Sequence, residues 1–261
     1  MNTEHLARSV DIALNKHGGD IRSYHKDFCR RMYAASFDRY ATRLKMIQYT
    51  DKNRVLDAGC GFGQWSFALA DCGNKRIDAC DISLDRINVF QEILTQTGRD
   101  NIHPVASPLE RLPYDNGVFD CIFCYGVIHA ADISAALQEF YRVLKIRGRL
   151  YFTANGLGYY VKRWLDDNSR TQDHSPKIDI ARAMLSTALA EKYGSKKLPW
   201  GLIVEPKAML ALVRAAGFST LGQEDEGHLT LGDNKDPLPF FTDNYSGLTG
   251  VYEILAEKPE V

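Results

Sequence analysis

The feature that most constrains the fold is a glycine cluster, Gly59, Gly61 and Gly63, that directly follows a short apolar run over residues 54–57. Glycine lets the backbone bend sharply and approach a bound molecule without a Cβ atom in the way. Residues 64–70 predict a helix that closes near Gly73. A strand, a tight loop and a helix with unpaired N–H groups at its start form a site suited to a nucleotide-like ligand.

Strands and helices alternate along much of the remaining chain. After the first strand, the pattern predicts a helix that begins near Ser83 and a helix from Asp132 that Gly148 ends. A further helix is expected near 205–216. This alternation indicates a parallel α/β sheet. Apolar runs predict its other strands over 76–80, 103–106, 119–125, 149–154, the residues after Gly217, and 250–257.

Two regions depart from this alternation. Before residue 50 the apolar residues recur at helical spacing, and residues 156–203 place aromatic side chains among polar ones. We interpret the second region as an insertion. The expected organisation is an N-terminal helical cap (1–50), a cofactor-binding α/β core (51–155), an inserted substrate cap (156–203) and the C-terminal part of the core (204–261).

Charge and composition exclude several classes of protein. The 261 residues include 32 Lys and Arg against 33 Asp and Glu, a net charge of −1 that argues against a dedicated nucleic-acid surface. No apolar run is long enough for a membrane span, and the acidic Glu4 does not fit a signal peptide. We therefore expect a cytoplasmic protein that binds neither nucleic acid nor membrane. Cys121 and Cys124 have the spacing of a metal knuckle but lack a second pair, so we expect no metal site.

Two acidic residues narrow the ligand class. Asp81 ends the second strand, where a carboxylate can accept hydrogen bonds from both hydroxyls of a ribose. Asp57 stands two residues before the first glycine of a G-x-G-x-G pattern, whereas a dinucleotide site has G-x-G-x-x-G. A carboxylate there would repel a pyrophosphate and suits an ammonium or sulfonium group. The residues thus favour a cationic nucleoside such as S-adenosylmethionine over a nicotinamide cofactor.

Four stretches of the chain resemble the sequence motifs of a known protein family. Residues 55–63 resemble the first motif of the class I S-adenosylmethionine-dependent methyltransferases, in the branch that mostly modifies small molecules, and residues 80–83 resemble its ribose motif. Residues 112–120 and 139–145 are similar to the segments before its fourth and fifth strands. The resemblance implies a Rossmann-like sheet of seven mostly parallel strands with helices on both faces and an antiparallel last strand near 252–257. The helical N-terminus and the inserted cap would cover its carboxyl edge.

The resemblance also implies residue roles in binding S-adenosylmethionine. Asp57 and the three glycines would hold the methionine moiety, Asp81 the ribose and Ile82 the adenine. The backbone N–H of Leu109 would reach the adenine ring, while Pro108 stands where the family usually has an acid. The remaining cofactor contacts are expected from Glu110, Cys124 and Arg31.

The acceptor site is expected just past the fourth strand and in the caps. His129 is the candidate general base or acceptor-orienting group, and Tyr33, Tyr125 and Tyr159 are candidate substrate contacts. His174 and Trp200 in the insertion could also face the acceptor. The predicted function is methyl transfer from S-adenosylmethionine to a small organic acceptor, at a hydroxyl of a sugar or secondary metabolite. The alternatives are methylation of RNA or protein, and a non-catalytic protein of the same fold that binds adenosyl ligands. The oligomeric state, monomer or dimer, stays open.

Overall fold

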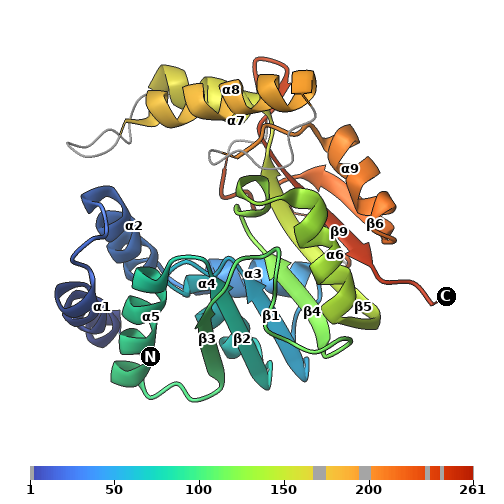
Figure 1. The fold of residues 1–261 in the computed structure, drawn as a ribbon. Coiled ribbons are helices and arrows are strands. Elements are labelled where there is room, and N and C mark those ends of the chain that lie inside the picture. Colours follow the sequence, from blue (N-terminus) through green and yellow to red (C-terminus); the bar gives the residue numbers. More distant parts are fainter. Residues whose placement is uncertain (1–2, 167–174, 194–200, 233–235, 242–243, 261) are drawn as a thin grey trace.

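A seven-stranded sheet forms the centre of the computed structural model, which describes residues 3–166, 175–193, 201–232, 236–241 and 244–260 (Figure 1). The strand order is β3-β2-β1-β4-β5-β9-β6. The first five strands in this order run parallel, and β9 is antiparallel to both of its neighbours. The predicted fold class is therefore confirmed. The strands are β1 (Arg54–Ala58), β2 (Arg76–Asp81), β3 (Ile102–Ala106), β4 (Phe119–Cys124), β5 (Leu144–Asn155), β6 (Ser219–Asp225) and β9 (Val251–Glu257).

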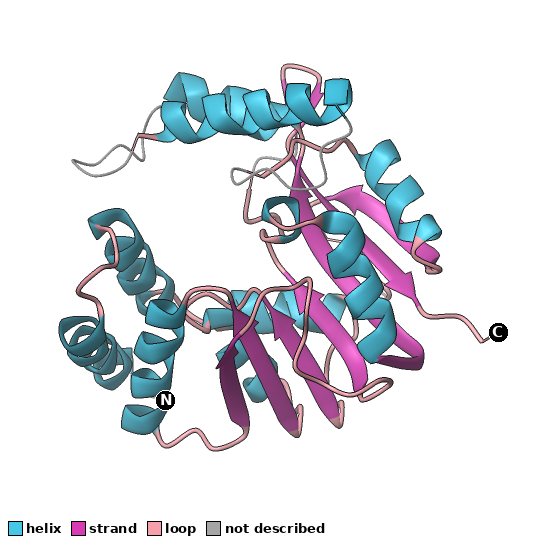
Figure 2. Ribbon diagram, viewed as in Figure 1, coloured by secondary structure: helices cyan, strands magenta, loops and turns pink. Residues whose placement is uncertain are grey.

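Helices cover both faces of the sheet because successive strand residues point to opposite sides. Val55 and Ile77 belong to one buried cluster, and Leu56 and Ile122 belong to the other. Such strands, buried on both faces, explain the near-continuous apolar runs in the sequence. The first cluster includes residues of α1 (Thr3–His17), α2 (Ser23–Ala34), α3 (Asp38–Met46), α4 (Gln64–Asp71) and α5 (Leu84–Thr97), and the second includes residues of α6 (Ile133–Val143) and α9 (Pro206–Ala215) (Figure 2).

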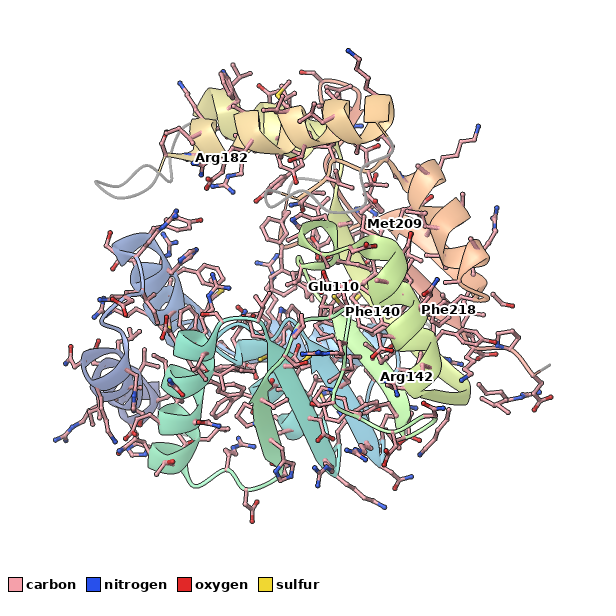
Figure 3. All side chains as sticks on the ribbon, in the orientation of Figure 1. Glu110, Phe140, Arg142, Arg182, Met209 and Phe218 are labelled. Atoms are coloured by element: carbon pink, nitrogen blue, oxygen red, sulfur yellow. The ribbon has the colours of Figure 1, made fainter. Side chains whose placement is uncertain are left out.

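The second cluster shows how α6 and α9 are held to the sheet. Phe140 of α6, Met209 of α9 and Phe218 are all buried on this side (Figure 3). The sequence analysis extended the helix here too far, because it used Gly148 as the end. The helix ends at Val143, and the next residue, Leu144, already pairs with Phe119 in the sheet.

Further elements follow the carboxyl ends of the strands. Helix α7 (Leu157–Asp166) begins two residues after β5 and packs beside α8 (Pro176–Tyr193), at the top of the view in Figure 1. A short hairpin, β7 (Asn244–Tyr245) and β8 (Leu248–Thr249), contacts α7. The 3₁₀ turn η1 (Ile128–Ala130) follows β4. The chain thus places its least regular segments at the edge where ligands bind in sheets of this kind.

Candidate functional site

The centre of the site is the point where the order of the strands reverses. Strands β1 and β4 are parallel neighbours, but the chain continues from β1 toward β2 and arrives at β4 from β3. The loops after these two strands therefore diverge and leave a crevice between them. A cavity of about 240 Å³ lies there. It is lined by Tyr24, His25 and Phe28 of α2, by Gly59, Cys60, Gly61, Phe62 and Gln64, by Arg86, and by Tyr125, Gly126 and Val127.

The three motif glycines have positive φ angles of +79°, +57° and +89°, and they serve two purposes. A Cβ atom at Gly59 would lie 2.6 Å from the side chain of Val127, and one at Gly63 would lie 2.0 Å from the ring of Phe90. Those two positions exclude any side chain because the loop packs tightly. At Gly61 and Gly126 a Cβ atom would meet nothing within 4 Å. These two glycines therefore bring bare backbone to the open space of the cavity.

Asp57 lies behind the glycine loop. Its carboxyl is 2% exposed and accepts a hydrogen bond of 2.5 Å from the Ser66 hydroxyl in the first turns of α4. Burial raises the pKa of Asp57 to about 7, with the nearby Asp81 adding to the shift and the Ser66 hydrogen bond opposing it. Asp57 is not among the residues that line the cavity. A positive charge held in the loop would favour the ionised form of this carboxyl.

Asp81 is not among the residues that line the cavity, but backbone groups hold its carboxylate against the glycine loop. One carboxylate oxygen accepts from the Gly61 N–H at 3.0 Å, and the other accepts from the Ser83 N–H at 2.9 Å. The Arg86 guanidinium lies 3.9 Å away. The neighbouring Ile82 side chain is 73% exposed, which is unusual for a large apolar residue beside a buried carboxylate. Asp81 and Ile82 thus place a fixed hydrogen-bond acceptor next to an exposed apolar side chain.

Gln64 was missed by the sequence analysis, although its position gave a signal. It is the first residue of α4, directly after the third glycine, where backbone N–H groups lack helical partners. The residue lines the cavity, and its side-chain oxygen is buried and has no hydrogen-bond partner among the described residues. A buried carbonyl oxygen without a donor is costly unless a bound group supplies one. An ammonium group is a donor of the required kind.

Of the ten predicted cofactor residues, only Gly59 and Gly61 line the cavity, and besides Asp57, Gly63, Asp81 and Ile82 four more residues lie away from it. The side chains of Leu109 and Cys124 are buried in the cluster beneath α6. Glu110 accepts a hydrogen bond of 3.0 Å from the Asp132 N–H at the start of α6. Arg31 is exposed on α2, whereas Tyr24, His25 and Phe28 of the same helix face the cavity. Their cofactor contacts stay predictions.

His129 lies in η1, close to the end of β5. Its Nε2 atom is 3.2 Å from the side-chain nitrogen of Asn155, and Asn155 also hydrogen-bonds the hydroxyl of Tyr160. Burial lowers the pKa of His129 to about 4, so the ring is neutral at pH 7. Its Nδ1 atom is buried and has no partner among the described residues. In the tautomer in which Nε2 accepts from the Asn155 amide, the ring proton is on Nδ1.

Two of the three predicted substrate residues, Tyr125 and Tyr159, contact the same third ring, that of Phe241. Tyr125 lines the cavity, and its ring stacks on Phe241 with centroids 6.2 Å apart. Phe241 in turn meets Tyr159 of α7 edge-on, also at 6.2 Å. We refer to Tyr125, Phe241 and Tyr159 as the aromatic wall. Tyr33 does not belong to it, because it is buried and its hydroxyl donates to the Phe62 carbonyl at 2.6 Å.

Glu226 fixes the aromatic wall, and sequence reasoning missed it. It is fully buried and accepts hydrogen bonds from the Tyr125 hydroxyl at 2.7 Å and from the N–H groups of Phe240 and Phe241 at 2.7 and 3.1 Å. In the sequence it stands between Asp225 and a glycine, a context typical of an exposed turn. No local signal distinguishes it.

Other expectations concern metals, membranes and the insertion. Within the described ranges, no group of three or more His, Cys, Asp or Glu side chains could hold a metal ion, and Cys121 and Cys124 are buried free thiols. None of the helices in these ranges is long and apolar enough to cross a lipid bilayer. His174 and Trp200 lie outside the residues that the structure describes.

Comparison with known proteins gives consistent matches. Residues 55–148 match the family model of a methyltransferase domain. A ubiquinone/menaquinone biosynthesis C-methyltransferase of Geotalea daltonii is 29% identical over 130 residues, 48% of this chain and 55% of the relative. A malonyl-[acyl-carrier protein] O-methyltransferase of Legionella pneumophila is 28% identical over 152 residues, 56% of this chain and 50% of the relative. The chain thus spans about half the length of these relatives.

A solved structure of geranyl diphosphate methyltransferase in complex with S-adenosylmethionine superposes with a TM-score of 0.58 over 92% of both chains. At 12% identity this likeness concerns the fold alone. It agrees with the strand order, and the domain match covers the glycine motif, Asp81 and the two segments before β4 and β5. Residues 55–148 therefore form a methyltransferase domain, and the resemblance of the chain to class I S-adenosylmethionine-dependent methyltransferases is supported.

Proposed function

We propose that the chain transfers a methyl group from S-adenosylmethionine to a small organic acceptor. The observation that carries this proposal is the cavity at the strand reversal, which is lined by bare glycine backbone and by Gln64, a residue whose buried side-chain oxygen has no partner among the described residues. Gln64 would accept hydrogen bonds from the ammonium group, and Asp81 would accept them from the ribose hydroxyls. Ile82 would pack against the adenine. When bound, S-adenosylmethionine supplies a methyl group on a positively charged sulfur.

The acceptor is proposed to be a flat ring that carries a hydroxyl group. The aromatic wall supports this choice, since aromatic rings pack against one another in stacked or edge-on arrangements. A catalytic contribution from positioning needs an acceptor held in line with the methyl group and away from water. His129 would contact the acceptor hydroxyl through Nδ1, the ring nitrogen that has no partner among the described residues, and the hydroxyl proton would leave to this ring or to water as the methyl group is transferred.

Binding tests the first part of the proposal. Calorimetric titration with S-adenosylmethionine and S-adenosylhomocysteine should show binding of both, while NADH should not bind. The substitution Asp81→Ala should weaken the binding of S-adenosylmethionine and of S-adenosylhomocysteine by at least tenfold, since a hydrogen bond to a charged group contributes about 1.5–3 kcal/mol. Asp85→Ala, which removes the same charge from the nearby start of α5, serves as the matched control and should bind normally. Binding of NADH alone would refute the cofactor assignment.

The acceptor class needs a second experiment. Phenols, hydroquinones, sugars and short RNA are incubated with S-adenosylmethionine labelled with carbon-13 in its methyl group, and the product is examined by NMR. An O-methyl signal from ring hydroxyls supports the proposal. A C-methyl signal from hydroquinones would support carbon as the acceptor, an alternative favoured by the name of the Geotalea daltonii relative. Methylation of sugars or RNA alone would contradict the role of the aromatic wall.

A further inference from the structure

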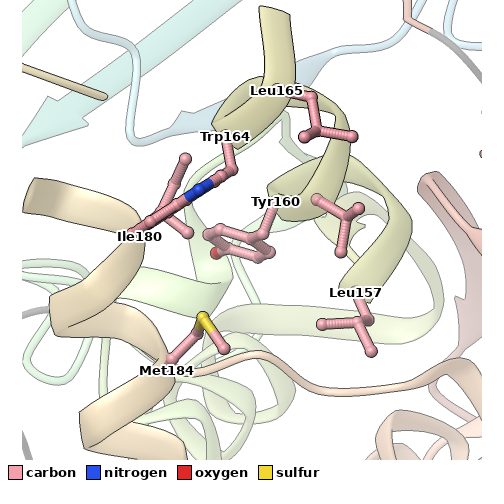
Figure 4. Close-up of a pocket in the computed structure, with 7 residues that line it drawn as sticks. Leu157, Tyr160, Trp164, Leu165, Ile180 and Met184 are labelled. Carbon is pink, nitrogen blue, oxygen red and sulfur yellow. The ribbon is translucent and has the colours of Figure 1, made fainter. Parts of the chain in front are cut away.

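An apolar groove lies between α7 and α8 in the inserted region. It has a volume of about 270 Å³. Figure 4 shows Tyr160 between the two helices, with Trp164 and Ile180 on one side and Leu157 on the other. The lining residues are Leu157, Tyr160, Val161, Trp164 and Leu165 of α7, and Ile180 and Met184 of α8. Every lining side chain except Tyr160 lacks a charged or hydroxyl group.

The groove is built from a face of α7 that helices normally bury. Its apolar residues recur at positions 157, 160, 161, 164 and 165, the spacing of a stripe that packs against a core. Helix α8 covers this stripe only in part, because Trp164 is 39% exposed, Leu165 is 62% exposed and Met184 of α8 is 50% exposed. Large apolar side chains exposed together commonly mark a binding site.

The groove adjoins the aromatic wall through ring contacts. Tyr160 meets Tyr159 edge-on with ring centroids 5.4 Å apart, and Tyr159 contacts Phe241, which stacks on Tyr125 at the cofactor cavity. Aromatic rings in contact thus lead from the cavity to the groove. The Tyr160 hydroxyl hydrogen-bonds Asn155, the partner of His129, while its ring lines the groove. Tyr160 therefore separates a polar side near His129 from an apolar side between the helices.

We propose that this groove binds a hydrocarbon chain attached to the acceptor, so that the substrate has a ring head on the aromatic wall and an apolar tail between α7 and α8. This inference rests on the proposed function and specifies its substrate class. An apolar cavity of about 150 Å³ is sufficient to bind benzene, so the groove has room for a chain of roughly ten carbon atoms. Each methylene that enters the groove should raise kcat/KM about three- to fourfold.

A chain-length series with two matched variants tests the proposal. Hydroquinones with n-alkyl chains of increasing length are assayed with wild type, Met184→Trp and Leu185→Trp. Met184 lines the groove and Leu185 does not, yet both are 50% exposed and adjacent on α8. We expect kcat/KM to rise with chain length in wild type and Leu185→Trp and to be independent of it in Met184→Trp. All three proteins should methylate unsubstituted hydroquinone equally. The same chain-length dependence in all three would overturn the proposal.

A binding experiment separates this inference from the proposed function. Calorimetric titration with 1-octanol needs no methyl transfer, so it reports on the groove even if no acceptor is turned over. We expect 1-octanol to bind wild type and Leu185→Trp, with at least a tenfold loss in Met184→Trp. Absence of binding to wild type would refute the tail site while leaving the methyltransferase proposal intact. Dissociation of a dimer by Met184→Trp in sedimentation equilibrium would instead assign the groove to a second copy of the chain.

Discussion

At the scale of single residues, we expect the proton on Asp57 to couple cofactor binding to pH. Burial raises its pKa to about 7, and a bound cation would lower it, so binding should release a proton. The affinity for S-adenosylmethionine is therefore expected to fall by up to about tenfold per pH unit below pH 7. Asp57→Asn should bind more weakly at pH 8 and with little dependence on pH. Calorimetry in buffers of different ionisation enthalpy measures the released proton directly.

The same residue gives a linked expectation for the ligand-free protein. Because the pKa of folded Asp57 lies above its ordinary value of 3.8, the stability associated with its proton is complete below about pH 4 and is lost as the pH rises through 7. The free energy of unfolding should thus decline between pH 4 and 8 more steeply in wild type than in Asp57→Asn. Urea unfolding at each pH measures this free energy. If it changed with pH equally in both proteins, the Asp57 carboxyl would be ionised across the whole range.

The pH dependence of catalysis tests His129. With its pKa lowered to about 4 by burial, the imidazole stays neutral from pH 5 to 9, so kcat/KM should show no inflection near 6.5 from this residue. Asn155→Asp would place a carboxylate beside Nε2 and favour the charged ring. In Asn155→Asp we expect an inflection from His129 at a pH above 4, whereas Asn155→Ser should add no inflection from this residue. An inflection near 6.5 in wild type that His129→Gln removes would restore His129 as a general base.

At the scale of elements, Glu226 holds the loop that completes the aromatic wall. Glu226→Gln keeps the shape but offers one oxygen to three donors, and a buried donor left unpaired costs about 1–3 kcal/mol. We expect a higher KM for the acceptor and a lower free energy of unfolding, with unchanged affinity for S-adenosylmethionine. Glu224→Gln on β6 is a matched control in a more accessible position. A loss of cofactor affinity equal to the loss of acceptor affinity would contradict this role.

The two loops at the site differ in how far the sequence could predict them. The glycine loop is marked by its composition, because Gly59, Gly61 and Gly63 all have positive φ angles, a conformation that favours glycine. The aromatic wall depends on Tyr125 and Glu226, which lie 101 residues apart, and on Phe241 reaching both Tyr125 and Tyr159. No local pattern predicts a contact of that separation. For the same reason the sequence did not reveal that Tyr24, His25 and Phe28 are the residues of α2 that line the cavity.

At the scale of the whole molecule, strand positions followed from apolar runs and the sheet order from the family resemblance. What the sequence did not reveal is the buried polar centre that joins the helices to the last strand. Arg43 of α3 and Glu253 of β9 form a fully buried ion pair although they are 210 residues apart. Arg43 also donates to the Leu229 carbonyl, and Glu253 accepts from Tyr151 at 2.6 Å. Neither residue stands in a pattern that distinguishes it from a surface charge.

This ion pair should couple the N-terminal helices to the sheet. Arg43→Met leaves the Glu253 carboxylate buried without its cation, and breaking a buried pair in this way costs about 3–5 kcal/mol. In the double variant with Glu253→Gln, the stranded charge is gone, so the loss of stability should be smaller than in Arg43→Met alone. Urea unfolding of both single variants and the double variant measures the coupling, with cofactor affinity unchanged because neither residue lines the cavity. Strictly additive losses would show that the two charges are solvated independently and that the helices are held by apolar packing alone.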